Sequence, residues 1–530
     1  MLDYLITDAE ILDGSGAEAF RGDVGVQGGT ITAVGRLVDR PAHNRIAANG
    51  RTLTPGFLDI HRHGDGALFR PDYGKAELKQ GLTSVINGNC GLSAAPLDPA
   101  YQMETVQYLT PILGELPSGV EWNSLAAYFR DAAAAPRRIH TGMLVGGGTL
   151  RTNVAGYADG PLSAGQLRQL HTLMERALSD GALGVSLGLG YAPECFYSTD
   201  ELVQALEPLK DSGVVVTVHM RQEGDGVVQA LAEMLQVARR LRTPVEISHL
   251  KAIGRRNWRS SVPEMLRMMD AARQEGVDVT CDVYPYPAGS TQLIHVLPPE
   301  VQTGGLEALT ARLRDPACRR ELRRRMETGQ DFENITALVG FENVVATSLR
   351  KPENRCWEGK TLAEIAAAQG KDPFNALFDL LAAECCTVSM IDFIAAEEDL
   401  NAILQDPHAA VISDATYPTT GTLHPRVYGM TAHLLEHYVR QTRTLFLPEA
   451  VRRLTRLPAD RFGLRKKGRI EVGADADLCL FDPSAIHEAG TYAQPRQYAQ
   501  GMDYVFVGGV PAIADGEFTD HCGGCLLRRE

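Results

Sequence analysis

The sequence lacks several features that mark common classes of protein. Its 530 residues include 52 Lys and Arg against 66 Asp and Glu, so the formal charge is −14. Binding to nucleic-acid phosphates needs clustered basic side chains, and this excess of acid argues against a nucleic-acid partner. No apolar run is long enough to cross a membrane, and neither a GxGxxG nor a Walker A sequence occurs. We therefore expect no membrane or nucleic-acid partner, and the sequence does not decide between a monomer and a homo-oligomer.

Cysteine is also scarce, with ten residues in the whole chain. The segment after Met1 has no basic region followed by a long apolar run, so we expect no signal peptide and a cytoplasmic protein with reduced thiols. Cys522-Gly-Gly-Cys525 has the spacing of half a zinc knuckle, but no second CxxC pair accompanies it. The sequence assigns no role to this tail.

The two ends of the chain share one pattern. Residues 1–54 and 463–530 carry short stretches of alternating apolar and polar residues separated by glycines, which is typical of antiparallel strands. Neither end is large enough to enclose a core alone. We therefore predict one small β-sandwich domain that both termini build together.

The central residues 55–462 change to apolar strands that alternate with helical stretches, which predicts an α/β fold with a parallel sheet. Eight candidate strands favour a closed (β/α)8 TIM-like barrel, with a doubly wound open sheet as the alternative. The candidate strands are 57–63, 83–89, 143–146, 184–189, 214–219, 244–249, 277–283 and 409–414. Residues from about 285 to 345 break this rhythm, and we predict an inserted subdomain or lid there.

Two histidines close the first predicted strand, in the run Thr54-Pro-Gly-Phe-Leu-Asp-Ile-His-Arg-His63. Alternate side chains of a strand point to the same face, so His61 and His63 would lie side by side. Two imidazoles at one strand end form half of a metal site. An isolated HxH pair is a weak signal, and its meaning depends on the other strand ends.

Further metal-binding residue types stand at those other strand ends. His219 and His249 are the last residues of two predicted strands 30 positions apart, Asp414 ends the eighth strand, and Cys90 lies in the loop after the second. The carboxyl ends of barrel strands meet at one face, where active sites are built. Imidazole, thiolate and carboxylate together suit Zn²⁺. The sequence therefore predicts a zinc site at that face.

The sequence resembles the amidohydrolase superfamily and, within it, the N-acyl-D-amino-acid deacylases, or D-aminoacylases. The resemblance extends over nearly the whole chain. It rests on Pro55-Gly-Phe-Leu-Asp-Ile-His-Arg-His, Gly81-Leu-Thr-Ser-Val-Ile-Asn-Gly-Asn-Cys-Gly, Ser248-His-Leu-Lys, Tyr284-Pro-Tyr-Pro-Ala-Gly-Ser-Thr, His424-Pro-Arg-Val-Tyr-Gly and Val472-Gly-Ala-Asp-Ala-Asp-Leu. The HxH pair is common to the superfamily, whereas the Asn-Cys-Gly and Tyr-Pro-Tyr segments are more specific to the deacylases.

The resemblance implies zinc-dependent hydrolysis of the amide bond of N-acyl-D-amino acids, which releases a carboxylate and a free D-amino acid. It implies one tight zinc held by Cys90, His219 and His249, and a second, weaker position near His61, His63 and Asp414. By the same likeness, Asp414 would act first as general base and then as general acid. The residues implied to hold the substrate are Lys251, Tyr284, Ser290 and Arg426, and Tyr191 is a further candidate for the pocket wall.

Two other functions stay open from the sequence. A cyclic-amide hydrolase of the dihydroorotase or hydantoinase type would share the barrel and the metals but would need a carboxylated lysine at a strand end, and the predicted strand ends offer none. A non-catalytic, metal-stabilised binding protein would have no use for Asp414. The loop between Asp414 and Arg426 departs from the family's usual short continuation. The sequence therefore does not fix the preferred amino-acid side chain or acyl group.

Overall fold

Parallel strands in the middle of the chain form the centre of the fold. The computed structural model describes residues 1–329 and 332–529. Six parallel strands form a sheet in the order β17-β13-β12-β11-β10-β9, and three form a second sheet in the order β6-β7-β8. Their bounds are β6 Phe57–Asp59, β7 Leu82–Asn87, β8 His140–Met143, β9 Val145–Gly146, β10 Gly184–Gly188, β11 Val215–His219, β12 Val245–Ile247, β13 Val279–Val283 and β17 Ala409–Val411. Seven predicted strands each correspond to one of these, several of them ending earlier than predicted, whereas the predicted strand 143–146 covers the end of β8 and all of β9.

Backbone hydrogen bonds link the two parallel sheets at both junctions. At one junction the amide of Leu183, before β10, donates to the carbonyl oxygen of Met143 in β8 (2.9 Å). At the other, the amide of Asp414 donates to the carbonyl oxygen of His61 and the amide of His63 donates to that of Ala415, each at 3.0 Å. The second junction brings the residues that follow β6 and β17 side by side.

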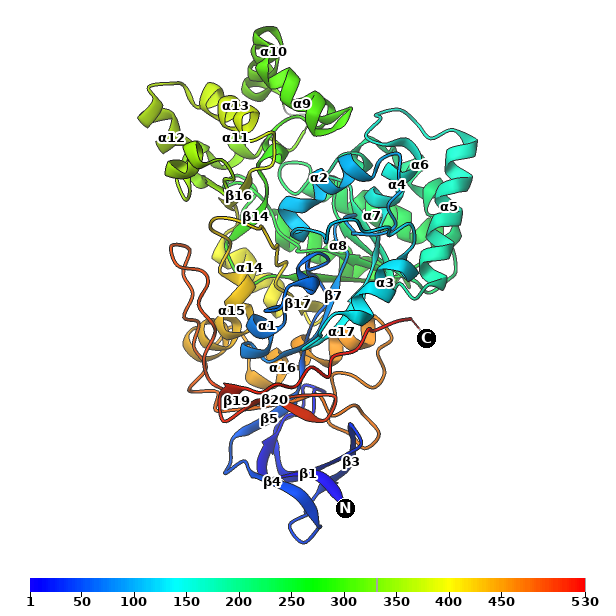
Figure 1. The fold of residues 1–530 in the computed structure, drawn as a ribbon, viewed down its shortest axis with the longest axis vertical. Coiled ribbons are helices and arrows are strands. Elements are labelled where there is room, and N and C mark those ends of the chain that lie inside the picture. Colours follow the sequence, from blue (N-terminus) through cyan, green and yellow to red (C-terminus); the bar gives the residue numbers. More distant parts are fainter. Residues whose placement is uncertain (330–331, 530) are drawn as a thin grey trace.

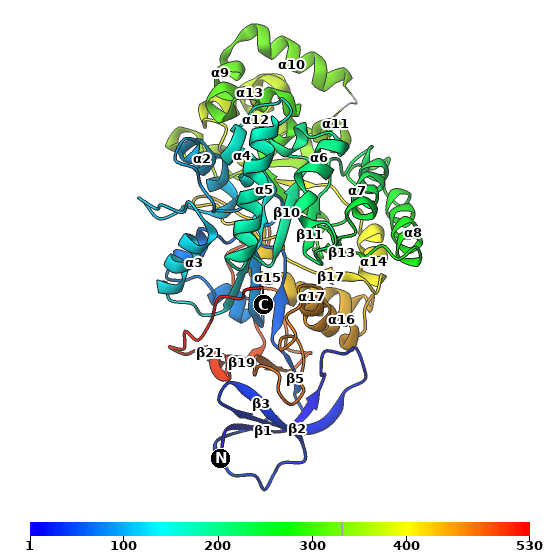
Figure 2. The same cartoon turned by 90° about the vertical axis from the view of Figure 1, so that its right-hand side faces the viewer.

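Helices cover the outside of these strands (Figures 1 and 2). Helix α7, for example, buries residues spaced three and four positions apart, namely Val227, Ala230, Leu231, Met234 and Leu235. The covering helices include α1 Lys75–Lys79, α3 Leu125–Ala134, α4 Gly147–Ala155, α5 Ala164–Ser179, α6 Thr199–Ala205, α7 Val227–Leu241, α8 Ser261–Gln274, α14 Glu397–Gln405, α15 Arg426–His433, α16 Leu447–Leu454 and α17 Arg456–Arg461. None of the described helices combines the length and the apolar character that a membrane span requires.

Between β13 and β17 the chain leaves the parallel strands and builds a separate layer. Its antiparallel sheet has the order β14-β16-β15, with bounds β14 Ala288–Gln292, β15 Val344–Thr347 and β16 Ser389–Phe393. Five of its helices are α9 Gly305–Arg314, α10 Pro316–Thr328, α11 Ile335–Val339, α12 Leu362–Gln369 and α13 Pro373–Ala383. Figure 1 shows this layer at the end of the molecule opposite the N-terminus. It includes the predicted insertion of about 285–345 and continues to the end of β16.

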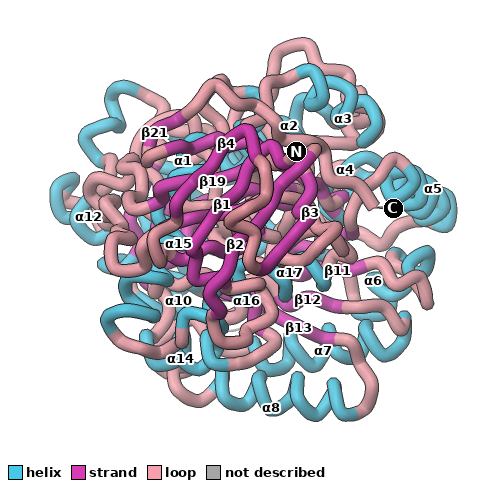
Figure 3. The backbone as a smooth tube through the Cα atoms, turned by 90° about the horizontal axis from the view of Figure 1, so that it is seen from below, coloured by secondary structure: helices cyan, strands magenta, loops and turns pink. Residues whose placement is uncertain are grey.

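Both termini contribute to one mixed sheet, seen from below in Figure 3. Eight of its nine strands follow the order β21-β20-β19-β18-β5-β1-β2-β3, and the ninth, β4, pairs with β1. The strands are β1 Leu2–Ile11, β2 Phe20–Gln27, β3 Thr30–Gly35, β4 Ala42–Ala47, β5 Thr52–Pro55, β18 Leu478–Phe481, β19 Met502–Val507, β20 Val510–Ala514 and β21 Glu517–Phe518. These strands are connected in a single sheet, and their buried residues form an apolar cluster around Ile6, Leu53 and Phe506.

Candidate metal centre

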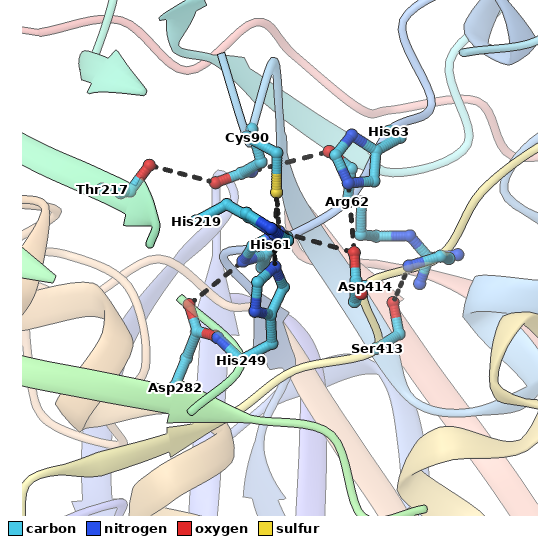
Figure 4. A network of polar contacts seen from close by, with 12 residues as sticks. His61, Arg62, His63, Cys90, Thr217, His219, His249, Asp282, Ser413 and Asp414 are labelled. Carbon is cyan, nitrogen blue, oxygen red and sulfur yellow. Dashed lines mark hydrogen bonds and ion pairs between the residues drawn. The ribbon is translucent and has the colours of Figure 1, made fainter. Parts of the chain in front are cut away.

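Six buried side chains from different strand ends meet as two overlapping groups of metal-ligand atoms. One group consists of His61, His63, Cys90 and Asp414, and the other consists of Cys90, His219 and His249. Within each group the ligand atoms lie within 4.8 Å of one another. Figure 4 shows the Cys90 sulfur pointing into the cluster of imidazoles. The structure thus brings together every residue that the sequence predicted as a metal ligand.

The contacts around Cys90 are those of a compact nitrogen and sulfur site. Cys90 Sγ lies 3.2 Å from His61 Nε2 and 3.5 Å from His249 Nε2. His249 Nε2 lies 3.0 Å from His219 Nδ1. Thiolate and imidazole are the ligands that Zn²⁺ prefers, so the donor set fits this ion. Because Cys90 belongs to both groups, it is placed where one ligand can serve two positions.

Electrostatics favour the ionised forms of the two acidic ligands. Burial raises the pKa of the Cys90 thiol, but the charges of His61 and His249 outweigh burial and hold that pKa well below its usual range. Burial likewise raises the pKa of Asp414, but the Arg426 guanidinium and the neighbouring histidines together outweigh burial, so this pKa also lies well below normal. The Asp414 carboxylate contacts His63 Nε2 (3.1 Å) and Arg426 Nη2 (3.0 Å). A thiolate and a carboxylate therefore face the same space.

Three of the candidate ligands have left-handed backbone conformations, which are rare outside glycine. The φ angles are 52° at Cys90, 36° at His249 and 51° at Asp414. Each such residue costs roughly 1–3 kcal/mol and persists only where its surroundings impose it. Here a side-chain carboxylate of Asp282 accepts the amide of His249, and the His61 carbonyl accepts the amide of Asp414. The strain coincides with the site and turns these side chains toward it.

The loop that carries Cys90 is held from three sides. The amide of Gly91 donates to Ser186 Oγ (3.0 Å), and Asn89 Nδ2 donates to the Ile60 carbonyl oxygen (3.1 Å). Glu194 Oε2 accepts the amide of Gly188 (2.8 Å) and would lie 2.0 Å from a Cβ placed on Gly91. A side chain at position 91 has no room there, which explains the glycine after the cysteine.

Two buried carboxylates behind the ligands are functional candidates that sequence reasoning missed. Asp282 Oδ2 lies 3.2 Å from His61 Nδ1, and Glu223 Oε1 lies 3.0 Å from His249 Nδ1. Such carboxylates fix the tautomer and the orientation of a metal-binding imidazole. The available signals were a lone acid near the end of an apolar strand and an acid four residues after His219.

The ligands open onto a cleft of about 270 Å³. Four of the five predicted substrate-contacting residues line it, namely Tyr191, Lys251, Tyr284 and Ser290, together with His219, His249 and Asp414. The fifth, Arg426, is buried beside them, with its guanidinium carbon 4.6 Å from the centre of the Tyr284 ring. Its Nη2 donates to the Ser290 carbonyl oxygen (3.1 Å), whereas Nε and Nη1 have no hydrogen-bond partner among the described residues.

The layer between β13 and β17 supplies the outer wall of this cleft. Its contributions include Leu297, Glu300, Phe332, Glu333 and Ile335. Lys251 Nζ donates to Glu223 Oε1 at 2.7 Å on the inner side. The cleft therefore has a polar floor at the metal ligands and a mixed wall built by a separate part of the chain. Cys522 and Cys525 belong to neither metal-ligand group.

A comparison with family models assigns the chain to a family. The model described as "Amidohydrolase family" matches residues 45–513. The chain belongs to the amidohydrolase family. This finding, with the ligand pattern above, confirms the resemblance drawn from the sequence.

Curated members of the amidohydrolase family match along the full length of this chain. It is 31% identical to the "D-aminoacylase" of Alcaligenes xylosoxydans xylosoxydans, over 99% of this chain and 98% of the relative. It is 32% identical to the "N-acyl-D-glutamate deacylase" of the same organism, over 100% and 97%. The fold is also similar to a crystal structure of N-acyl-D-glutamate deacylase from Bordetella bronchiseptica. That protein is complexed with zinc and a phosphonate mimic of the tetrahedral intermediate, and the alignment covers 100% of each chain. It has a TM-score of 0.85 at 31% identity. The α/β fold is therefore that of these amidohydrolases.

Proposed function

We propose that this protein is a zinc-dependent hydrolase of N-acyl-D-amino acids, which releases a carboxylate and a free D-amino acid. The observation that carries the proposal is the Cys90, His219 and His249 group, with the Asp414 carboxylate beside it, at the floor of a cleft. Two relatives that match the full chain are named D-aminoacylase and N-acyl-D-glutamate deacylase. A binding protein would have no need of an ionised carboxylate next to a metal position.

We assign one tight zinc to Cys90, His219 and His249, and a weaker second position to His61, His63 and Asp414. The donor types and their mutual distances fit zinc at the first position. When bound, zinc supplies Lewis acidity that polarises the scissile carbonyl and lowers the pKa of water to roughly 7. The cyclic-amide alternative needs a carboxylated lysine between the ligands, and Lys251 instead pairs with Glu223 at 2.7 Å.

Asp414 acts as the proton carrier in this proposal. Its carboxylate takes a proton from the attacking water and then delivers that proton to the nitrogen of the leaving D-amino acid. The contacts with His63 and Arg426 hold the carboxylate facing the cleft. One carboxylate thereby serves as base and as acid, and no net proton is gained or lost by the protein.

Arg426, Lys251, Tyr284 and Ser290 bind the substrate's α-carboxylate and scissile carbonyl. Arg426 Nε and Nη1, which have no hydrogen-bond partner among the described residues, can each donate to a substrate oxygen. Burial raises the pKa of Tyr284, so its hydroxyl keeps its proton and can donate to the developing oxyanion. Tyr191 packs on the His219 ring, with centroids 4.3 Å apart, and forms part of the pocket wall.

The architecture that supports this chemistry is, in our proposal, a closed (β/α)8 barrel over residues 55–462. The hydrogen bonds at both junctions between the parallel sheets support closure. Residues 1–54 and 463–530 form the accompanying small β-sandwich, and the apolar cluster shared by strands from both termini supports this. The segment from about 285 to 345 is an inserted subdomain or lid, and its residues wall the cleft.

The charges of the cleft favour a neutral substrate side chain. The basic residues that line it are already paired, namely Arg221 with Glu233, Lys251 with Glu223, and Arg325 with Glu300. An acidic side chain would bury a second carboxylate without a free cation, which is costly. We therefore expect apolar D-residues to be better substrates than D-glutamate or D-aspartate.

A substrate panel tests the function. Zinc-loaded protein is assayed with N-acetyl-D-leucine, N-acetyl-L-leucine, N-acetyl-D-glutamate and hydantoin, with and without a chelator. We expect D-leucine release to dominate and to disappear on removal of zinc. Equal rates on both leucine enantiomers, or full activity after chelation, would refute the proposal, and faster hydantoin opening would support the cyclic-amide alternative.

A further inference from the structure

A second cluster of reactive side chains lies on the C-terminal tail, outside the metal centre. The tail runs along β8 like an extra strand: Thr141 donates its amide to the Cys525 carbonyl oxygen, and Leu527 donates its amide to that of Thr141, each at 2.9 Å. This pairing places Cys525 Sγ 3.0 Å from Nδ1 of His140, the first residue of β8. Cys525 is exposed, whereas His140 is buried.

A carboxylate holds the far side of the His140 ring. His140 Nε2 lies 2.9 Å from Asp477 Oδ1, and Asp477 Oδ2 lies 2.6 Å from Lys467 Nζ. The backbone amide of Cys525 donates to His140 Nδ1 at 3.0 Å, so Nδ1 is an acceptor and Nε2 carries the proton that Asp477 receives. In this tautomer His140 Nδ1 faces both the amide and the thiol of Cys525, the latter at 3.0 Å.

The order sulfur, imidazole, carboxylate is the arrangement that activates a nucleophile. Burial raises the pKa of the Cys525 thiol, but its hydrogen bond with His140, and the positive charge that His140 gains when Nδ1 takes the thiol proton, leave the pKa below its usual value. Burial lowers the pKa of His140, and Asp477 outweighs this effect and raises it to about 9. Lys467 also faces the pair, and its Nζ lies 3.0 Å from Asp475 Oδ2.

Cys522 lies three residues before Cys525 and is also exposed. Its neighbour His521 is engaged elsewhere, since its Nε2 contacts the Val507 carbonyl oxygen at 2.9 Å. The tail histidine therefore does not complete a metal site with the two cysteines. Two thiols separated by two glycines, one of them activated, are instead the components of a dithiol that exchanges with disulfides.

We propose that Cys525 is a nucleophilic thiol, activated by His140 and Asp477, that exchanges with small-molecule disulfides, and that Cys522 resolves the product. The Cys525 thiolate attacks one sulfur of the small disulfide, forms a mixed disulfide and releases one thiolate. Cys522 then gives up its proton to solvent, attacks Cys525 Sγ and releases the second thiolate. Two protein thiols are oxidised to one disulfide, and one small disulfide is reduced to two thiols.

The test compares thiols within one protein. Reduced, zinc-loaded protein is incubated with oxidised glutathione at about pH 7, quenched with acid and mapped by peptide mass spectrometry. Cys356 is the internal control, because it is exposed and its sulfur contacts the Glu353 carbonyl oxygen (3.7 Å) in place of an imidazole. We expect Cys525 to react about tenfold faster than Cys356, from the larger thiolate fraction of a thiol with a lowered pKa.

Variants separate the steps. In Cys522→Ser the glutathione adduct on Cys525 should accumulate. The wild type should instead form a Cys522–Cys525 disulfide, seen as a peptide that contains both cysteines and is two hydrogen atoms lighter than the reduced peptide. In His140→Gln, with folding checked by circular dichroism, the rate at Cys525 should fall to that of Cys356. If that variant does not fold, the pH profile of iodoacetamide alkylation in the wild type decides. A Cys525 midpoint equal to that of Cys356, or equal exchange rates at the two thiols, would overturn the proposal.

Discussion

Replacing Glu223 with glutamine should weaken zinc binding without removing a ligand. Glu223 Oε1 lies 3.0 Å from His249 Nδ1 and 2.7 Å from Lys251 Nζ, and all three side chains are buried. A carboxylate behind a ligating imidazole fixes the ring and raises its basicity, and its loss costs about 10- to 100-fold in metal affinity. That range corresponds to about 1.4–2.7 kcal/mol. The same change leaves the buried Lys251 ammonium without its counter-charge, which should destabilise the metal-free protein by roughly 3 kcal/mol.

The two effects have separate readouts. Competition with a chromophoric chelator measures the zinc dissociation constant. Urea unfolding of the metal-free protein measures the loss of unfolding free energy caused by the unpaired Lys251 ammonium. Glu233→Gln is the matched control, because Glu233 forms a pair with Arg221 at 2.9 Å but contacts no candidate ligand. A folded Glu223→Gln protein whose zinc affinity stays within twofold of the wild type would show that the Glu223 contact does not support His249.

Three further changes test the site. Asp414→Asn should lower kcat by about 10²–10⁴-fold while zinc content, measured by atomic emission, stays near the wild-type level; an active variant would remove Asp414 as proton carrier. Cys90→Ala should abolish stoichiometric zinc, and an unchanged metal content would remove Cys90 from the ligand set. Burial raises the pKa of Glu194 from 4.5 to about 8, so the folded protein keeps a proton that the unfolded chain releases. The free energy of unfolding should therefore fall as pH rises from 4.5 to 8, by up to about 1.4 kcal/mol per pH unit. In urea titrations at several pH values, Glu194→Gln should lose this pH-dependent contribution. If the free energy of unfolding of the variant falls with pH as steeply as that of the wild type, the prediction is wrong.

The strand ends were predictable because the apolar runs and their last polar residues are local signals. The histidine pair shows the limit of that reasoning. The prediction placed His61 and His63 on one face of a strand, but β6 ends at Asp59 and the two histidines follow it. Their rings still meet, with centroids 5.5 Å apart, because hydrogen bonds to the chain after β17 fix the backbone there. The residue types identified the site, and a long-range junction determined its geometry.

Other parts of the site had no local signal. Glu223 and Asp282 are single acids whose meaning depends on imidazoles that lie 26 and more than 200 positions away in the chain, at His249 and His61. The pairing of Cys525 with His140 likewise joins the C-terminus to β8. Periodicity and motif spacing report neighbours along a strand or helix, and contacts of this kind arise only when the whole chain has folded.

The overlap of the two ligand groups at Cys90 accounts for unequal metal positions. Cys90, His219 and His249 contribute a thiolate and two imidazoles, and the Lys251 ammonium contacts His249 at Nδ1, not at the Nε2 that faces Cys90. The second position depends on Asp414, whose carboxylate already pairs with Arg426 at 3.0 Å. A cation there must share this carboxylate with a buried guanidinium, and like charges at such distances repel strongly where water is excluded. A cation at the second position would also bind the Asp414 carboxylate, which must be free to take the proton of the attacking water. We therefore expect the first position to fill at lower zinc concentration, and filling of the second to slow the reaction rather than to assist it.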